Sequence, residues 1–298
     1  MDTIKCNDAI ETILETANGE LAQRFDSDVI FLKAAMEPPV DDVIKDEIEA
    51  LREQKNASTK LTVLVETDGG FVETVERIVS VFRKHYDIVE YVIPNFAYSA
   101  GTILVLSGDE IYMDYYSVLG PIDPQIDMAE EGTVPGMGYL AKFKELLGSI
   151  NDPGKEVEET RAELAYLIKR FDPAILFTIE QAIEHSKSLL RTWLPRYKFK
   201  TWTAKETSGE TVTAADRQQR ADDIATILGD AEHWHSHGRG IGIKDLSSDL
   251  IKLKVVNYGD DKVLNARISH YYGLLIDYMR KTGYKSAVHS RRGLRKLQ

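Results

Sequence analysis

The feature that most constrains the fold is an alternation of short apolar runs with amphipathic segments in the first part of the chain. The apolar runs are rich in β-branched residues and have strand length; they are residues 29–32, 61–65, 88–93 and 110–113. Between them, residues 40–54 and 71–86 place apolar side chains at helical spacing. Strands that alternate with helices form βαβ units. The sequence therefore predicts an α/β fold with a mainly parallel sheet and flanking helices.

The second half of the chain has the pattern of a helical region. Helical spacing recurs at residues 155–170, 173–191, 213–228 and 260–281. Residues 7–24, at the start of the chain, have the same spacing. We therefore expect three parts: an N-terminal helical arm (1–24), an α/β core (25–150) and a helical C-terminal region packed on that core (151–298). The basic stretch at residues 291–296 is interpreted as a solvated tail.

Charge and cysteine content disfavour several classes of protein. The 298 residues include 37 Lys and Arg and 48 Asp and Glu, a formal net charge of −11 that argues against a general nucleic-acid binder. The single cysteine, Cys6, excludes an intramolecular disulfide. No apolar run approaches the roughly 18–20 residues of a membrane span, and the N-terminus lacks a signal-peptide pattern. We expect a cytoplasmic protein with neither a membrane span nor a nucleic-acid partner.

A serine stands at the junction between the third predicted strand and the helix that follows it. Residues 94–102 read Pro-Asn-Phe-Ala-Tyr-Ser-Ala-Gly-Thr, so Ser99 is flanked by small residues at the start of a helix. This position lifts a hydroxyl off the sheet and places free backbone N–H groups beside it, as a nucleophile requires. The alternative is an ordinary helix N-cap, for which serine is a preferred residue.

Two glycines follow the second predicted strand and are candidates for an oxyanion hole. Gly69 and Gly70 let the backbone turn so that N–H groups face a bound carbonyl. The N–H group of Ala100, directly after the serine, is the second candidate donor. Functional groups gather at the carboxyl ends of parallel strands, so Ser99 and both glycines are expected to lie close together. A plain glycine turn is the alternative interpretation.

The order of these motifs resembles the Clp protease/crotonase superfamily, and within it most closely the serine dehydrogenase proteinase family, which is related to signal peptide peptidase A. The motifs that carry the resemblance are residues 67–70, 99–102, 108–111, 119–125 and 234–241. They cover residues 28–145 closely and the His-Gly-Arg-Gly-Ile turn more loosely. The resemblance implies that Ser99 is the nucleophile and that Gly69 and Gly70 supply the oxyanion hole.

The catalytic base is predicted by the same resemblance to be a lysine. Clp-type peptidases place a histidine shortly before a proline, where this chain reads Gly-Pro-Ile-Asp-Pro at residues 120–124. The signal-peptide-peptidase relatives use a downstream lysine, which implies Lys142, 43 residues after Ser99. A lysine acts as a base only if burial lowers its pKa well below about 10.4. Lys144 and His237 are the alternative bases.

Two further groups of residues have alternative interpretations. Asp114 and Asp123 follow predicted strands, and either carboxylate could orient a base. His233, His235 and His237 alternate and would share one face of an extended segment, a possible zinc site. We favour a structural or solvated role for these histidines, and predict no metal and no cofactor.

The leading hypothesis is thus a serine peptidase that cleaves a peptide or protein substrate through an acyl-enzyme, with a Ser99–Lys142 dyad and an oxyanion hole of Gly69, Gly70 and Ala100. The resemblance also implies assembly into a homo-oligomer. Two other hypotheses remain: a crotonase-type enzyme that acts on acyl-CoA thioesters, and a non-catalytic scaffold of the same fold that binds a protein partner.

Overall fold

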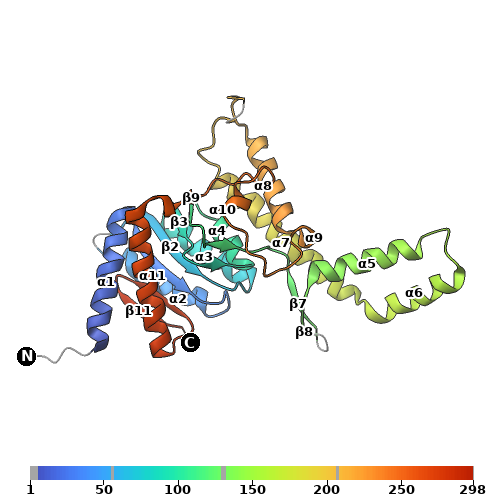
Figure 1. The fold of residues 1–298 in the computed structure, drawn as a ribbon, viewed down its shortest axis with the longest axis horizontal. Helices are drawn as coiled ribbons and strands as arrows, with labels where there is room; N and C mark the ends of the chain where they lie inside the picture. The colour runs from blue at the N-terminus through green and yellow to red at the C-terminus, as the bar shows by residue number, and fades with distance from the viewer. Residues whose placement is uncertain (1–5, 55–56, 129–131, 206–207, 298) are drawn as a thin grey trace, which may run out of the picture.

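A seven-stranded sheet forms the centre of the protein, as seen in a computed structural model that describes residues 6–54, 57–128, 132–205 and 208–297 (Figure 1). Its strand order is β11-β10-β1-β2-β3-β5-β9. In chain order the strands are β1 (Asp28–Lys33), β2 (Lys60–Glu66), β3 (Ile88–Val92), β5 (Glu110–Met113), β9 (Val256–Asn257), β10 (Ala287–Ser290) and β11 (Gly293–Lys296). The strands from β1 to β9 pair in parallel, and β10 and β11 add an antiparallel edge. The predicted α/β class, with its mainly parallel sheet, is confirmed.

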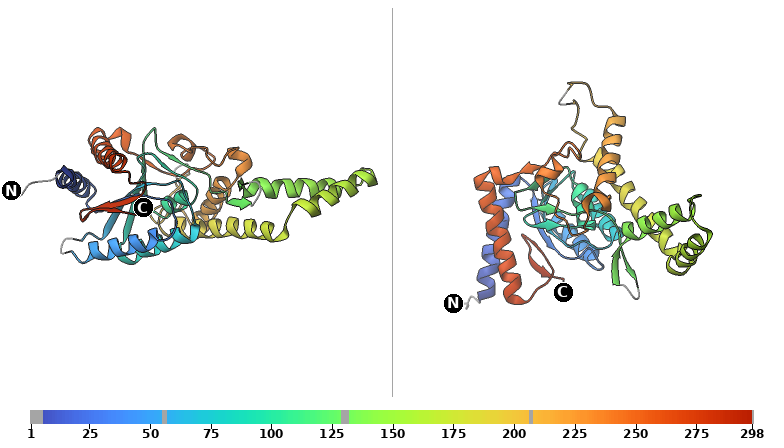
Figure 2. Two further views of the ribbon diagram at one scale, coloured as in Figure 1. Left: turned by 90° about the horizontal axis from the view of Figure 1, so that it is seen from below. Right: turned by 45° about the vertical axis from the view of Figure 1, so that its right-hand side comes forward.

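Helices cover both faces of this sheet, which explains why β1, β2 and β3 read as nearly continuous apolar runs. One face is covered by α2 (Val40–Arg52), α3 (Val72–His85) and α4 (Ala100–Leu106), and the other by α1 (Cys6–Phe25) and α11 (Lys262–Thr282) (Figures 1 and 2). Successive strand residues point to opposite faces. In β1, Ile30 and Leu32 therefore join the core beneath α2 and α3, whereas Val29 and Phe31 join the core beneath α1 and α11.

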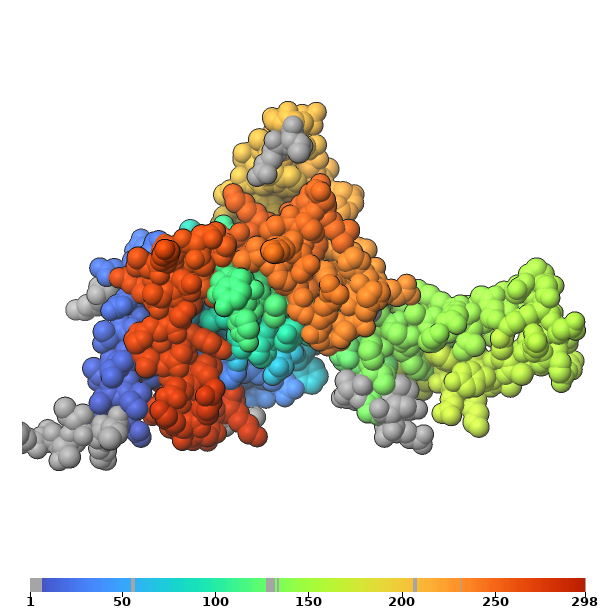
Figure 3. Space-filling model, viewed as in Figure 1, coloured from blue at the N-terminus to red at the C-terminus, as the bar shows by residue number. Residues whose placement is uncertain are grey.

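The middle of the chain builds two small sheets and a helical arm. The short strands are the parallel pair β4 (Phe96–Ala97) and β6 (Val118–Leu119) and the hairpin β7 (Gln125–Met128) and β8 (Gly132–Pro135). The helices that follow are α5 (Gly136–Ile150), α6 (Val157–Arg170), α7 (Pro173–Arg196), α8 (Ala214–Leu228), α9 (Ala231–Trp234) and α10 (Ile243–Leu246), and the 3-10 turn η1 (Tyr258–Asp260) precedes α11. Helices α5 and α6 project from the body as an arm, and α7 returns to it (Figures 1 and 3).

The C-terminal segment is a part of the central sheet, so its interpretation as a solvated tail is wrong. Strand β10 is fully buried and pairs with β1, and β11 pairs with β10 in turn. The basic side chains contact carboxylates of α2: Arg292 lies 3.5 Å from Glu47, and Arg295 lies 3.4 Å from Asp46. The charge run is therefore the partly solvated face of an edge strand, where basic residues also discourage pairing with another chain.

A buried histidine on β10 makes the fold sensitive to acid. His289 is fully buried, and the hydroxyl of Tyr271, which accepts from Asn18 Nδ2 at 3.0 Å, lies 2.7 Å from its Nδ1. Burial disfavours the imidazolium and lowers the pKa of His289 from 6.5 to about 4. Because the folded pKa is the lower one, this stabilisation is complete above pH 6.5 and is lost as the pH falls toward 4.

We expect His289 to account for up to about 3 kcal/mol of the free energy of unfolding lost between pH 6.5 and 4, at roughly 1.4 kcal/mol per pKa unit. Urea denaturation at a series of pH values checks this for wild type and for His289→Gln, with the exposed His233→Gln as the matched control. The loss should be smaller in His289→Gln and unchanged in His233→Gln. Equal acid sensitivity in all three proteins contradicts the expectation.

Candidate active site

Ser99 adopts a backbone conformation that side-chain-bearing residues seldom take. It connects β4 to α4 with φ 52° and ψ −120°, outside the favoured regions for a non-glycine residue. Hydrogen bonds on both sides hold this geometry: the Tyr98 N–H donates to the Thr67 carbonyl at 2.9 Å, and the Gly101 N–H donates to the Tyr98 carbonyl at 2.8 Å. Strain of this kind is often found at functional sites.

The Ser99 side chain is half-buried and makes no capping hydrogen bond to the helix that it precedes. A serine N-cap satisfies a free N–H group of the first turn through its side-chain oxygen. Ser99 does not do so, and the ordinary capping role considered for it does not apply. Its hydroxyl is therefore available for another partner.

Gly69 and Gly70 are brought directly against the serine and its neighbours, as the sheet order predicts. Gly69 has φ +103°, and a Cβ atom there would lie 2.8 Å from Ser99 Cβ and 2.8 Å from the Tyr98 carbonyl oxygen. Gly70 has φ +140°, and a Cβ atom there would lie 2.6 Å from the Met36 carbonyl oxygen. Both positions combine a backbone conformation that favours glycine with a close approach of neighbouring atoms.

The backbone N–H groups around Ser99 differ in whether they already have a hydrogen-bond acceptor. The Gly69 N–H donates to Thr67 Oγ1 at 3.0 Å and is thus engaged. The Gly70 and Ala100 N–H groups have no acceptor among the residues that the structure describes. Ala100 opens α4, where the first N–H groups have no intrahelical partner. Two free donors therefore lie on the glycine turn and at the helix start.

A buried threonine fastens the start of α4 to the segment that follows β6. Thr102 is fully buried, and its hydroxyl accepts from the Gly120 N–H at 3.0 Å. The same hydroxyl lies 2.9 Å from the carbonyl oxygens of Ala97 and Gly120, to which it can donate. The contact is close, because a Cβ atom on Gly120 would lie 3.3 Å from the Ser99 nitrogen. The chain from Gly120 onward thus begins beside Ser99.

Asp123 and His237 meet just beyond this point. Leu119 and Ile241 exchange two backbone hydrogen bonds, of 3.0 and 2.8 Å, in an antiparallel bridge. Asp123 comes four residues after Leu119, and His237 comes four residues before Ile241. His237 Nδ1 lies 2.9 Å from Asp123 Oδ1. The Asp123 carboxylate is fully buried, and the His237 side chain is 23% exposed. An aspartate on Nδ1 fixes the tautomer in which Nε2 accepts a proton.

The two lysines considered as bases lie on the arm helix α5. Lys142 is 70% exposed and forms an ion pair of 2.5 Å with Glu145. Lys144 is exposed as well. Neither has the burial that a lysine base requires. The other carboxylate considered, Asp114, accepts from the N–H groups of Tyr116 and Ser117 at 2.8 and 3.0 Å and so organises a turn.

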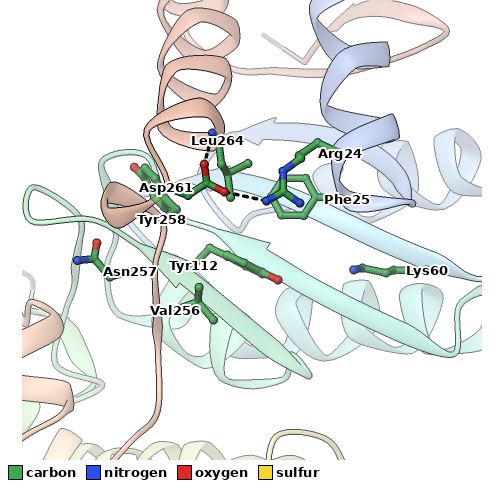
Figure 4. A pocket seen from close by; sticks show the side chains of 9 residues that line it. All are labelled: Arg24, Phe25, Lys60, Tyr112, Val256, Asn257, Tyr258, Asp261 and Leu264. Atoms are coloured by element: carbon green, nitrogen blue, oxygen red, sulfur yellow. Dashed lines mark hydrogen bonds and ion pairs between the residues drawn. The ribbon is translucent and has the colours of Figure 1, made fainter.

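A cavity of about 250 Å³ lies away from these residues, between the end of α1, the sheet and the start of α11 (Figure 4). Across it, Arg24 forms an ion pair of 2.7 Å with Asp261, and the ring of Tyr112 forms part of the wall. Its lining contains neither Ser99 nor any other candidate site residue. It is therefore distinct from the candidate active site.

Gly69→Ala is expected to destabilise the protein by about 2 kcal/mol or more. The substitution places a side chain in a strained backbone conformation, and the new Cβ would lie 2.8 Å from Ser99 Cβ. The matched control is Gly273→Ala, an exposed position of α11 with no atom within 4 Å of the new Cβ. There we expect a gain of about 0.5–1 kcal/mol from helix propensity. Urea denaturation measures both, and equal effects would show that the glycine turn tolerates a side chain.

Part of this chain is similar to known proteins. Residues 40–135 match the family described as ClpP-like SDH-type serine proteinase. Two proteins of Methanocaldococcus jannaschii are similar: the uncharacterised MJ1495 is 26% identical over 162 residues, and the uncharacterised MJ0137 is 34% identical over 85 residues. The alignments cover 53% and 28% of this chain. They span 54% and 30% of the relatives, so the chain matches about half of their length or less.

Two solved structures show distant similarity. A mutant of the 1510-N membrane-bound stomatin-specific protease has a TM-score of 0.32 and 19% identity, covering 45% of this chain and 67% of that one. ClpP1 from Listeria monocytogenes has a TM-score of 0.40 and 12% identity, covering 81% of this chain and 98% of that one.

Among the described helices of the present protein, none has both the length and the apolar content to cross a membrane.

The family match includes both the glycine turn and Ser99. It confirms the resemblance indicated by the Asp-Gly-Gly and Ser-Ala-Gly-Thr motifs. Over residues 40–135, this chain is similar to the ClpP-like SDH-type serine proteinases.

Proposed function

We propose that the protein is a serine peptidase in which Ser99 is the nucleophile, His237 the general base and Asp123 the residue that orients the base. The observation that carries this assignment is the 2.9 Å contact between His237 Nδ1 and the buried Asp123 carboxylate. Asp123 lies on the segment that Thr102 fastens to the first turn of α4, and His237 lies on the segment that pairs with it through the bridge between Leu119 and Ile241. A nucleophile, a base and an orienting carboxylate are the components of a catalytic triad.

In the proposed reaction, the Ser99 hydroxyl oxygen attacks the carbonyl carbon of a peptide bond while His237 Nε2 accepts the hydroxyl proton. Asp123 stabilises the imidazolium that forms. The Gly70 and Ala100 N–H groups, which have no acceptor in the described structure, donate to the oxyanion. The carbon–nitrogen bond then breaks, and His237 returns the proton to the leaving amine. Water, deprotonated by the same imidazole, hydrolyses the acyl ester and regenerates Ser99.

The choice of His237 over Lys142 rests on burial and contacts. A neutral imidazole accepts a proton near pH 7 without special surroundings, whereas a lysine must first lose its hydration. The Lys142 side chain is 70% exposed and already paired with Glu145. The oxyanion hole is likewise proposed as Gly70 and Ala100, with Gly69 holding the turn, since the Gly69 N–H already donates to Thr67.

The experiment is labelling with a fluorophosphonate, which reacts covalently with activated serines. Intact mass spectrometry should show one adduct, and peptide mapping should place it on Ser99. The Ser99→Ala variant should remain unlabelled, whereas Lys142→Ala should be labelled at the wild-type rate. Absence of an adduct on wild type between neutral and mildly alkaline pH contradicts the proposal and favours a non-catalytic scaffold. Binding of an acyl-CoA ester by an unlabelled protein would instead indicate crotonase-type chemistry.

A further inference from the structure

A groove of about 460 Å³ lies between α7 and α8, which pack side by side (Figure 1). Its volume is within the range of small-molecule sites, roughly 300–1,000 Å³. Three of the seven described residues that line it are arginines, Arg191 and Arg196 on α7 and Arg217 on α8, and none of the seven is acidic. The chain as a whole has a formal net charge of −11. The groove is therefore a local concentration of positive charge on an acidic protein.

Contacts between the two helices hold the walls of this groove in place. The Arg191 guanidinium forms an ion pair of 2.6 Å with Glu184 and a second ion pair with Asp222 of α8. From α8, Gln218 Nε2 donates to the Arg191 carbonyl at 3.3 Å. Arg191 thus links α7 to α8, and two carboxylates compensate its charge. Its role in the groove is to fix the position of the two helices.

The other two arginines have no carboxylate partner among the residues that the structure describes. Arg217 is half-buried and donates from Nε and Nη2 to the Trp202 carbonyl, at 3.2 and 2.9 Å. Arg196 is exposed, and its guanidinium carbon lies 5.3 Å from the centre of the Tyr197 ring, a cation–π contact. A carbonyl oxygen and an aromatic ring orient these guanidinium groups but do not neutralise them. Two uncompensated positive charges therefore line the groove.

The donors that these two side chains leave unused suit a phosphate group. A guanidinium is always charged, and it binds phosphate through paired, charge-assisted hydrogen bonds. The bonds of Arg217 to Trp202 leave Nη1 without an acceptor in the described structure, and no described residue accepts from Arg196. A phosphate monoester carries a charge of about −1.5 to −2 at pH 7. Its charge therefore matches the two uncompensated cations.

The rest of the lining indicates what else the ligand carries. The remaining residues are Thr192, Pro195, Ala214 and Gln218, so the described lining contains no aromatic side chain. Proteins that hold the base of a nucleotide commonly stack it on an aromatic ring. We therefore expect the groove to recognise the phosphate itself rather than a base attached to it.

We propose that the groove between α7 and α8 binds a phosphate group, free or as a simple ester, through Arg196 and Arg217. Arg191 holds the two helices in position for this contact. The bound anion would bridge α7 and α8 and relieve the repulsion between the two uncompensated cations. Ser99 and His237 do not line the groove. The proposal is therefore independent of the peptidase proposal.

Isothermal titration calorimetry with pyrophosphate at low ionic strength tests the site in the whole chain. Wild type should bind one equivalent with a Kd of about 1 mM or tighter. Arg217→Gln and Arg196→Gln should each weaken binding by about tenfold or more, because each removes charge-assisted hydrogen bonds. The matched control is Arg280→Gln, at an exposed position of α11. It changes the net charge of the chain by the same amount and should bind like wild type.

Two results would overturn the proposal. One is wild type that does not bind pyrophosphate at millimolar concentration. The other is equal weakening in Arg196→Gln and Arg280→Gln, because the effect would then be one of net charge alone. Far-ultraviolet circular dichroism verifies folding. If Arg217→Gln does not fold, Arg196→Gln still decides the question, since Arg196 is exposed and its described contact is with a ring.

Two further titrations define the ligand. Glycerol phosphate represents a simple ester, and its affinity relative to that of pyrophosphate identifies the preferred source of the phosphate; saturable binding of either supports the site. AMP adds a base to the ester and should bind about as tightly as glycerol phosphate, because the described lining has no ring for stacking. If AMP binds about tenfold more tightly or better, the groove recognises the base and the proposed ligand class is wrong.

Discussion

Replacement of Ser99 by alanine is expected to lower kcat/KM for peptide hydrolysis by about four to six orders of magnitude. The substitution removes the atom that would form the acyl-enzyme, and the residual rate comes from substrate binding and oxyanion stabilisation alone. Its strained backbone is held by hydrogen bonds of its neighbours rather than by its own side chain. We therefore expect Ser99→Ala to fold normally. Steady-state kinetics with a fluorogenic peptide library measures the loss.

The matched control for Ser99 is a serine whose hydroxyl has an ordinary structural role. Ser80 lies exposed on α3, and its hydroxyl donates to the Glu76 carbonyl at 2.8 Å. Ser80→Ala should retain wild-type kcat/KM and circular dichroism. If Ser99→Ala and Ser80→Ala hydrolyse peptides equally well, the nucleophile is elsewhere and the proposed mechanism is wrong.

The second large effect that we expect is the loss of activity on replacing His237, the proposed general base. We expect His237→Ala to lower kcat/KM by about 10³ to 10⁴, since general base catalysis and orientation of the nucleophile are lost together. Asp123→Asn keeps the shape of the side chain, but it favours the wrong imidazole tautomer and should cost about 10² to 10⁴. Lys142→Ala removes a surface ion pair and should change kcat/KM less than about twofold.

Comparison of these variants decides between the histidine and lysine mechanisms. Activity is measured across pH 5–10, so that a shifted optimum is not mistaken for a loss of catalysis. In His237→Ala it should be lowered by about 10³ to 10⁴ at every pH. A large loss in Lys142→Ala together with an active His237→Ala would restore the Ser-Lys dyad that the family resemblance implies. Lys144→Ala serves as a second surface-lysine control on the same helix.

Strands β1, β2 and β3 were predictable because nearly all of their residues are buried, and β1 and β2 are each followed by an amphipathic helix. Strands β10 and β11 were not predicted. The sequence Ala287-Val288-His289-Ser290 is too short and too polar for a period of two to stand out. The charges of Gly293–Lys296 indicated solvent exposure, which is correct for one side of an edge strand but hides its backbone pairing with β10.

The contacts of the candidate site also differ in how far the sequence predicts them. The contact between Gly69 and Ser99 follows from sheet order, because both residues come after neighbouring parallel strands. The contact between Asp123 and His237 spans 114 residues and depends on the bridge between Leu119 and Ile241, for which the sequence contains no local signal. The alternation of His233, His235 and His237 did not indicate it either, because the contact with Asp123 is made by His237, which lies four residues before Ile241 of this bridge. The exposure of Lys142 is a tertiary property that chain position alone does not report.

The pairing of β10 with β1 has a consequence for biosynthesis. Strand β1 ends at residue 33, but the strand that covers its outer edge begins only at residue 287. At about 5–20 residues per second, the ribosome needs on the order of tens of seconds to make the intervening chain. During this time one edge of the nascent sheet has no cover and can pair with other chains. A ribosome that stalls before residue 287 would thus release an aggregation-prone product.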